Sequence, residues 1–307
     1  MSMGWLVNDC LTCIPGTKTF WNDMMEWFPF IQDKTNGYTP FTELSKRIEN
    51  ESIMNGIPDF ILRNATFFRK LNIPCKHISF LQDCYVDKTR IKMMQIDVCN
   101  NSDMVVYNSN YIQSRYMNHI KSESTVIPIG TDFDFFYPMK NKKELSEKWG
   151  VLKDSILFIG STNKIKGFDK ILWLIENTNY NFCLVMKDDF VINNKRVKVF
   201  NKVNQISIRE IINCCSMLIC SSIVETFHLS GVEAAACNIP LLVTDVGVYY
   251  GMEDGEWGCK IKNDNYLNGI EYIFKNLESF CPREKFIFLG MDKKTCRYEW
   301  QKLFDRI

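Results

Sequence analysis

The sequence predicts an α/β fold made of two domains with parallel sheets. Apolar runs of strand length alternate with amphipathic stretches of helix length, a pattern typical of parallel sheets covered by helices. The chain has 307 residues, enough for two modest cores. The polar stretch 137–143 contains Pro138 and interrupts the alternation. We therefore expect domains at 1–139 and 140–307, with the last helix as a candidate to pack back on the first domain.

The first half contains the elements of one short α/β domain. Each apolar run is followed by a polar, glycine- or proline-containing stretch, which is how strands and helices end. The expected strands are Gly4–Asn8, Lys76–Leu81, Met104–Asn108 and Thr125–Ile129, and the expected helices are 18–28, which ends before Pro29, and 109–120.

The second half repeats the alternation. The expected strands are Ser155–Ile159, Phe182–Met186, Val197–Phe200, Met217–Cys220 and Leu241–Thr244, and the expected helices are Phe168–Glu176, Ile206–Cys214, Leu229–Cys237, 264–278 and 291–306. Ligands of such sheets bind at the carboxyl ends of the strands, so functional residues are sought in the loops that follow them.

Composition and charge exclude several classes of protein. Hydrophobic residues make up 46% and charged residues 24%, as in an ordinary globular protein. Residues 1–139 hold 13 basic and 15 acidic side chains, and residues 140–307 hold 24 and 21, so neither half has the basic excess of a nucleic-acid binder. No apolar run reaches the ~18 residues of a membrane span and no signal peptide is visible, so we expect a cytoplasmic protein.

Thirteen cysteines occur without regular spacing, and we expect them to be reduced thiols. Cys10 and Cys13 have CxxC spacing, and a redox role for them stays open. A zinc site would need a second pair or histidines at ligand spacing, which the sequence does not show. We therefore predict no metal.

The most informative segment is 221–247, SSIVETFHLSGVEAAACNIPLLVTDVG, in which Glu225 and Glu233 stand eight positions apart. Glu225 falls in a loop before a helix of small residues, and Glu233 falls about one turn into that helix. A carboxylate there can accept hydrogen bonds from two ribose hydroxyls. The helix start at Leu229–Gly231 offers free backbone N–H groups and a positive dipole end to a diphosphate. The segment therefore favours binding of a nucleotide-sugar.

Four segments resemble, in order and spacing, the retaining family 4 of the GT-B glycosyltransferases, the E-x7-E enzymes. They are Asp103–Ser109, Val126–Pro138, Ile159–Phe168 and 221–247. Together they span about residues 100–250, roughly half of the chain. The resemblance implies two Rossmann-like domains with a cleft between them, the first being short.

The resemblance also implies roles for individual residues. Lys166, before a glycine, would bind the donor diphosphate. Glu225 would contact the transferred sugar or its phosphates, and Glu233 would hold the ribose. The backbone amides that would face the sugar and phosphate belong to Phe227, His228 and Leu229.

The chain departs from the family pattern at two places. The family usually has arginine after the glycine of the phosphate loop, whereas Gly160 is followed here by Ser161, and we expect Lys164 to replace the missing charge. The family's E-G-F-G-L is here E-T-F-H-L, so Thr226 and His228 stand where glycines are usual. The second departure leaves the path of the loop backbone open. His228 could donate to a phosphate or sugar hydroxyl, or only fill space.

The first half matches the family less well. Lys18-Thr19 lacks the glycines of a P-loop and no G-x-G-x-x-G follows a strand, which argues against an NTPase and a dehydrogenase. Gln82-Asp83 stands where many members have a histidine, and Asp83 is our candidate to bind or deprotonate the acceptor hydroxyl. Asp132-Phe133-Asp134 has the spacing of a metal motif from another fold, but it lies in the segment between domains and is expected to be structural.

The predicted enzyme moves a hexosyl or pentosyl group from a nucleotide-diphosphate sugar to an acceptor hydroxyl with retention, without a metal or other cofactor. The expected acceptor is a glycan, lipid or protein. One alternative is glycosylation of hydroxymethylated bases in DNA, as in compact viral enzymes of this fold. Another is a catalytically weak sugar-nucleotide-binding protein. Donor base, acceptor and oligomeric state stay open.

Overall fold

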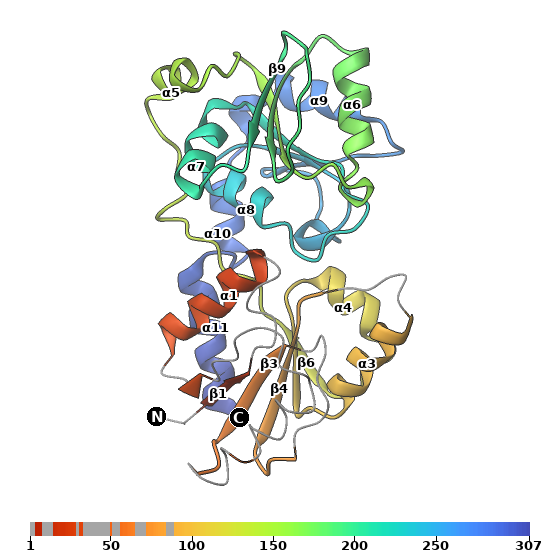
Figure 1. Ribbon diagram of the computed structural model, residues 1–307, viewed down its shortest axis with the longest axis vertical. Coiled ribbons are helices and arrows are strands. Elements are labelled where there is room, and N and C mark those ends of the chain that lie inside the picture. Colours follow the sequence, from red (N-terminus) through yellow and green to blue (C-terminus); the bar gives the residue numbers. More distant parts are fainter. Residues whose placement is uncertain are drawn as a thin grey trace. The chain divides into compact units, whose positions relative to one another are not determined.

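The computed structural model describes residues 4–7, 15–28, 31–32, 50, 56–64, 72–83 and 89–307. The chain forms two compact units, shown in Figure 1. The first contains residues 1–130 together with 294–307, and the second contains residues 131–293. Cys10 and Cys13 lie outside the described residues. No helix in the described ranges has the length and apolar character needed to cross a membrane.

The first unit is built on a parallel sheet with the strand order β2-β1-β3-β4-β5-β6. Its strands are β1 (Gly4–Val7), β2 (Ile31–Gln32), β3 (Phe60–Asn64), β4 (Lys76–Leu81), β5 (Met104–Tyr107) and β6 (Glu123–Val126). Its helices are α1 (Pro15–Trp27), α3 (Thr89–Asn100), α4 (Asn110–Tyr116) and α11 (Lys293–Arg306). The central strands β3, β4 and β5 are buried along almost their whole length, as expected for strands covered on both faces.

The C-terminal helix α11 belongs to the core of the first unit. Phe304 stacks on Phe60 of β3 at a ring-centroid distance of 4.7 Å and meets Phe28 edge-on at 5.1 Å. Trp300 lies 5.6 Å from Phe20 of α1. These aromatic contacts bring the last residues of the sequence back to its first strands, so the first unit is discontinuous in sequence.

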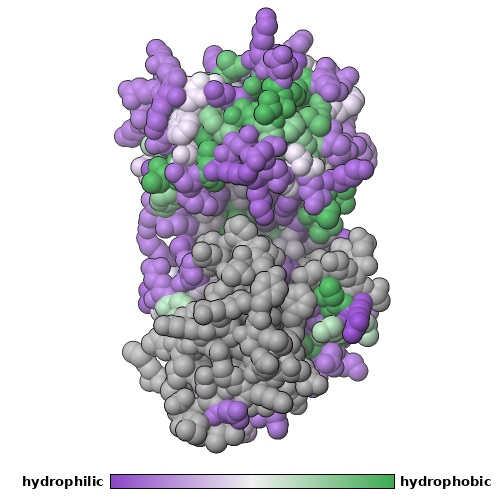
Figure 2. Space-filling model, viewed as in Figure 1, coloured by the Kyte–Doolittle hydropathy of each residue, from purple (hydrophilic) through white to green (hydrophobic). Residues whose placement is uncertain are grey.

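The second unit has a parallel sheet with the strand order β12-β11-β10-β7-β8-β9. Its strands are β7 (Ser155–Gly160), β8 (Asn181–Met186), β9 (Val197–Asn201), β10 (Met217–Cys220), β11 (Leu241–Val243) and β12 (Gly258–Lys260). Read from β9, this is the 3-2-1-4-5-6 order of the Rossmann fold. The edge strand β9 is only half buried, and Figure 2 shows hydrophobic residues in that region of the surface.

Helices alternate with the strands of the second unit, and two of them begin at asparagine caps. They are α5 (Lys142–Trp149), α6 (Phe168–Asn177), α7 (Gln205–Cys214), α8 (Leu229–Ala236), α9 (Tyr266–Lys275) and α10 (Pro282–Phe288), with 3-10 turns η1 (Lys164–Lys166), η2 (Gly247–Tyr249) and η3 (Leu277–Ser279). Asn204 and Asn265 accept backbone N–H groups of the first turns of α7 and α9. Helix α6 turns Ile171, Leu174 and Ile175 into the core.

The segment before α5 belongs to the second unit. Thr131 pairs with Asp292 in an isolated bridge, and its N–H donates to the Met291 carbonyl over 2.9 Å. Arg283 of α10 donates to the carbonyls of Phe133 (2.8 Å) and Phe136 (2.9 Å), and also to that of Ala236. The compact units divide at residue 130, whereas the sequence led us to expect a boundary at 139. These contacts join Thr131 to residues 291–292 and Phe133 and Phe136 to Arg283, all within the second unit.

Replacing Arg283 tests this attachment. Arg283→Ala removes a charged donor from three carbonyls, so we expect the free energy of unfolding of the second unit to fall by about 3 kcal/mol. Urea denaturation of the full chain measures this change. Arg297→Ala, at an exposed position of α11, is the control and should change stability by no more than about 0.5 kcal/mol. Equal urea midpoints for both variants would contradict the role assigned to Arg283.

Candidate functional site

The candidate site lies where the strand order of the second sheet reverses. Strand β7 is the first of this sheet in sequence, and its neighbours β8 and β10 continue the sheet in opposite directions. The loops that leave the carboxyl ends of β7 and β10 therefore meet side by side. This is the position at which open α/β sheets bind their ligands. The β7 loop contains Lys166, and the β10 loop contains Glu225.

The two loops are joined through their backbones. The N–H of Ile223 donates to the carbonyl of Ile165 over 2.8 Å. The hydroxyl of Ser221 donates to the carbonyls of Lys166 and Gly167 over 3.0 Å each. Gly167 has φ +64°, and a Cβ at this position would collide with the carbonyl oxygen of Ser221. Glycine is therefore required after Lys166 for both its backbone conformation and the close approach of the loops.

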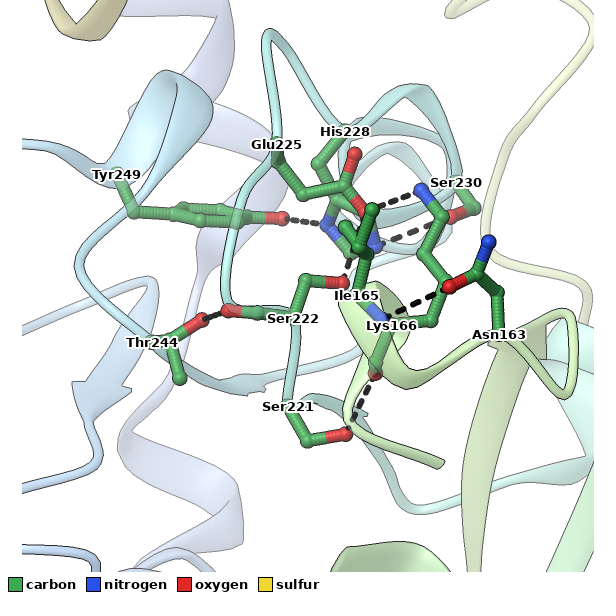
Figure 3. A network of polar contacts seen from close by, with 10 residues as sticks. All are labelled: Asn163, Ile165, Lys166, Ser221, Ser222, Glu225, His228, Ser230, Thr244 and Tyr249. Carbon is green, nitrogen blue, oxygen red and sulfur yellow. Dashed lines mark hydrogen bonds and ion pairs between the residues drawn. The ribbon is translucent and has the colours of Figure 1, made fainter. Parts of the chain in front are cut away.

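Lys166 and Glu225 form an ion pair at the junction of these loops (Figure 3). The ammonium of Lys166 lies 2.6 Å from Oε1 of Glu225, and the hydroxyl of Ser222 donates to the same oxygen over 2.9 Å. Glu225 is 8% exposed, whereas the Lys166 side chain is 35% exposed. Burial alone would raise the pKa of Glu225, but His228, Lys166 and Ser222 together lower it. Glu225 is thus an ionised carboxylate whose lysine partner still reaches solvent.

His228 forms the N-cap of α8 in a left-handed conformation, with φ 81° and ψ 64°. Its Nδ1 lies 2.7 Å from the Tyr249 hydroxyl, and its Nε2 lies 3.2 Å from the Ser230 hydroxyl. Burial lowers the pKa of His228 to about 4, although Glu225 opposes the shift, so the imidazole is neutral at pH 7. Both ring nitrogens of His228 therefore have a partner within the protein. A contact between His228 and a phosphate or sugar hydroxyl stays a prediction.

The first turn of α8 is shaped around this histidine. A Cβ at Gly231 would collide with the Tyr249 hydroxyl and the His228 ring, so the helix needs glycine there. No side chain caps the helix by a hydrogen bond. The positive end of α8, with the backbone of Phe227, His228 and Leu229, therefore lies in the loop that also holds Glu225.

Glu233 lies further along α8 and has a different environment from Glu225. Its side chain is partly exposed, and it makes no side-chain hydrogen bond or ion pair to any residue that the structure describes. Burial raises its pKa from 4.5 to about 7. Among the described residues, Glu233 is therefore a carboxyl group without a hydrogen-bond donor.

The other residues predicted to bind the donor in the β7 loop are half-buried or exposed. Gly160 ends β7 and Ser161 follows it, both half-buried, and Lys164 is exposed on η1. The loop is held by Thr162, whose N–H and hydroxyl both donate to Asp188, at 2.8 Å and 3.1 Å. The replacement of the missing arginine by Lys164 stays a prediction.

Asp83 and the DFD motif lie apart from this cluster in the sequence. Asp83 follows β4 in the first unit, where its carbonyl accepts a 3.5 Å hydrogen bond from Gln95. Its role toward an acceptor stays a prediction. Oδ1 of Asp132 accepts the N–H groups of Asp134 and Phe135, at 3.0 Å and 2.8 Å, so this aspartate closes a turn.

Sequence reasoning did not single out Ser222, Tyr249, Ser230 and Thr244, which support the site. Thr244 at the end of β11 donates to the carbonyl of Ser222 over 2.6 Å and so positions the β10 loop. Ser222 is within the informative segment, but nothing in its spacing marks it. Tyr249 lies in a glycine-marked loop, 21 positions after the histidine it contacts, where no local pattern could show the contact.

Part of the second unit matches a known family model. Residues 153–276, which include Lys166, Glu225 and Glu233, match the family model described as "Glycosyl transferases group 1". The match supports a group 1 glycosyltransferase of the GT-B type. Its residues lie entirely within the second unit.

A curated relative and several solved structures resemble the chain. The uncharacterized glycosyltransferase MJ1178 of Methanocaldococcus jannaschii is 27% identical over 196 residues, covering 60% of this chain and 52% of that protein. The chain thus spans about half the length of this relative. Alr3699/HepE of Anabaena, solved with UDP, has a TM-score of 0.76 at 13% identity and full coverage of both chains. A Rickettsia africae glycosyltransferase reaches 0.72 at 13% identity, covering 99% of this chain and 97% of its own. These structures confirm the predicted GT-B fold with two Rossmann-like domains.

The raised pKa of Glu233 predicts that the stability of the fold depends on pH. Between pH 4.5 and about 7 the unfolded chain loses the Glu233 proton before the folded chain does, so this residue destabilises the fold as the pH rises. Glu233→Gln should therefore be more stable than the wild type at pH 8 and no more stable near pH 4. Melting temperatures of both proteins across this range measure the difference. Glu176→Gln, at an exposed position of α6, is the control, and a Glu233 effect independent of pH would contradict the argument.

Proposed function

We propose that the protein is a retaining glycosyltransferase that moves a sugar from a nucleotide-diphosphate sugar to an acceptor hydroxyl without a metal ion. The observation that carries the proposal is the Lys166–Glu225 pair at the strand-order reversal of the second sheet, next to the start of α8. A cation and a helix N-terminus at one place provide two sources of positive potential for a diphosphate. Glu233, which has no donor among the residues that the structure describes, supplies the acceptor oxygens for a ribose.

Each residue has a distinct part in the proposed reaction. Lys166 and the backbone N–H groups at the start of α8 stabilise the negative charge that develops on the diphosphate as its bond to the sugar breaks. Glu225 holds Lys166 in position before the donor binds and then contacts the sugar or its phosphates. The acceptor hydroxyl attacks the anomeric carbon from the face that the diphosphate leaves, and its proton passes to the departing phosphate oxygen. The anomeric configuration is therefore retained.

Two further parts of the proposal concern the identity of the donor and of the acceptor. Alr3699/HepE has been solved with UDP and with UDP-glucose, which makes a uridine diphosphate sugar the first donor to test. Asp83 of the first unit is the proposed acceptor residue, and a glycan, lipid or protein is the proposed acceptor. A catalytically weak binding protein is disfavoured because the Lys166–Glu225 pair is kept together with Glu233.

Nucleotide binding is the direct test of the donor site. UDP, GDP, ADP and their common sugars should be screened by thermal shift, each with and without EDTA. We expect one nucleotide to raise the melting temperature by several degrees, unchanged by EDTA. Glu233→Gln should lose most of this shift, whereas Glu176→Gln should keep it. No shift with any nucleotide would contradict the donor site, and a shift abolished by EDTA would contradict metal independence.

Loss of Lys166 should slow the transfer step. Lys166→Ala removes the side-chain charge that faces the leaving diphosphate, so kcat should fall by about 10²-fold, the usual size of one such electrostatic contribution. Hydrolysis of the donor that the thermal-shift screen identifies provides an assay before the acceptor is known. Lys170→Ala on α6, which removes only a 3.5 Å surface pair with Asp264, should keep the wild-type rate. A wild-type rate for Lys166→Ala would exclude this residue from the mechanism.

A further inference from the structure

Three different metal-ligating side chains meet at the end of β10. Cys220 is the last residue of that strand, Glu225 lies in the loop after it, and His228 begins α8. One ligand atom from each, a sulfur, a carboxylate oxygen and a ring nitrogen, lies within 4.8 Å of the other two. Sulfur, nitrogen and carboxylate oxygen are the three ligand types that Zn²⁺ takes in proteins. The sequence predicted no metal because a single cysteine and a single histidine lack the paired spacing of the common zinc motifs.

The cluster is held in place by contacts outside it. Cys220 is 2% exposed, and its carbonyl accepts the N–H of Thr244 over 3.0 Å. The His228 ring is oriented by the Tyr249 hydroxyl at 2.7 Å, the kind of outer partner that fixes a ligating imidazole. The Ser230 contact with the other ring nitrogen is longer, at 3.2 Å. Ligands positioned in this way need only small side-chain movements to close around an ion.

We propose that Cys220, Glu225 and His228 form a binding site for Zn²⁺ in which an exogenous ligand takes the fourth position. Binding replaces the thiol proton of Cys220 by the metal, and the proton is released to solvent. The ion occupies the place at Glu225 that the Lys166 ammonium holds at 2.6 Å, so metal and lysine compete for one carboxylate. If the proposed donor site is correct, Zn²⁺ is consequently an inhibitor of donor binding rather than a cofactor.

The experiment uses the full chain, freed of metal by a chelator and titrated with Zn²⁺ or Co²⁺ in the absence of nucleotide. Calorimetry gives the affinity, and the near-ultraviolet absorption of Co²⁺ reports a thiolate ligand. Cys220→Ser should lose the cobalt–thiolate band and bind Zn²⁺ at least ~10-fold more weakly. Cys259→Ser, at a buried thiol of β12 in the same sheet, is the matched control and should keep both.

Lys166→Met gives a second test that does not depend on the stability of a core variant. Removal of the competing ammonium should tighten Zn²⁺ binding, whereas binding at any other of the cysteines would not respond. The proposal is overturned if Cys220→Ser keeps the cobalt–thiolate band, or if the affinity for Zn²⁺ is the same with and without Lys166. Because no nucleotide is present, a failure of the proposed donor site would not alter either result.

Discussion

The site depends on the reversal of strand order between β7 and β10. Two loops that are about 60 positions apart in the sequence can share hydrogen bonds only because their strands are neighbours at this reversal. Gly167 then lets the loops approach until Ser221 reaches two carbonyls of the other loop. The Lys166–Glu225 contact follows from this backbone junction, since a side chain at position 167 would separate the loops. The chemistry of the site is thus set by topology first and by side chains second.

The two glutamates show how one region can hold carboxyl groups of opposite character. Glu225 is buried and Glu233 is half-buried, and burial raises the pKa of a carboxyl group. Glu225 has a lysine at 2.6 Å and a serine hydroxyl at 2.9 Å, and these partners reverse the effect of burial. Glu233 has no such partner among the described residues, and its pKa rises to about 7. The first carboxylate is preorganised by the protein itself, while no residue that the structure describes supplies the second with a donor.

The sequence predicted most regular elements because apolar runs and caps are local signals. The strands Lys76–Leu81 and Met217–Cys220 were predicted with their observed bounds. Strand β3 was missed because Arg63 interrupts its apolar run, although this arginine is buried in the structure. Helix α5 was missed because it is mostly charged and buries only Leu145. Pairing between elements is not local, and for that reason the contacts of Phe133 and Phe136 with Arg283 could not be predicted from the sequence.

The positions of the candidate site residues were predicted in the same way, but their contacts were not. Spacing and resemblance selected Lys166, Glu225 and Glu233 one by one. Neither could show that the first two touch, because that contact depends on which strands are neighbours. Nor could they show that Tyr249 orients His228, since the two are joined only by the packing of η2 against α8.

Thr226 and His228 stand in the β10 loop where the family pattern has glycines, and their backbone conformations differ. Thr226 does not have a positive φ, so a side chain is accommodated there without strain. His228 has φ 81°, the left-handed backbone that glycine adopts most readily, and a non-glycine residue pays about 1–2 kcal/mol for it. Its contacts with Tyr249 and Ser230 offset that cost, at about 1 kcal/mol for each hydrogen bond. The loop therefore adopts at position 228 a backbone conformation that glycine favours, and it places an imidazole close to the Glu225 carboxylate.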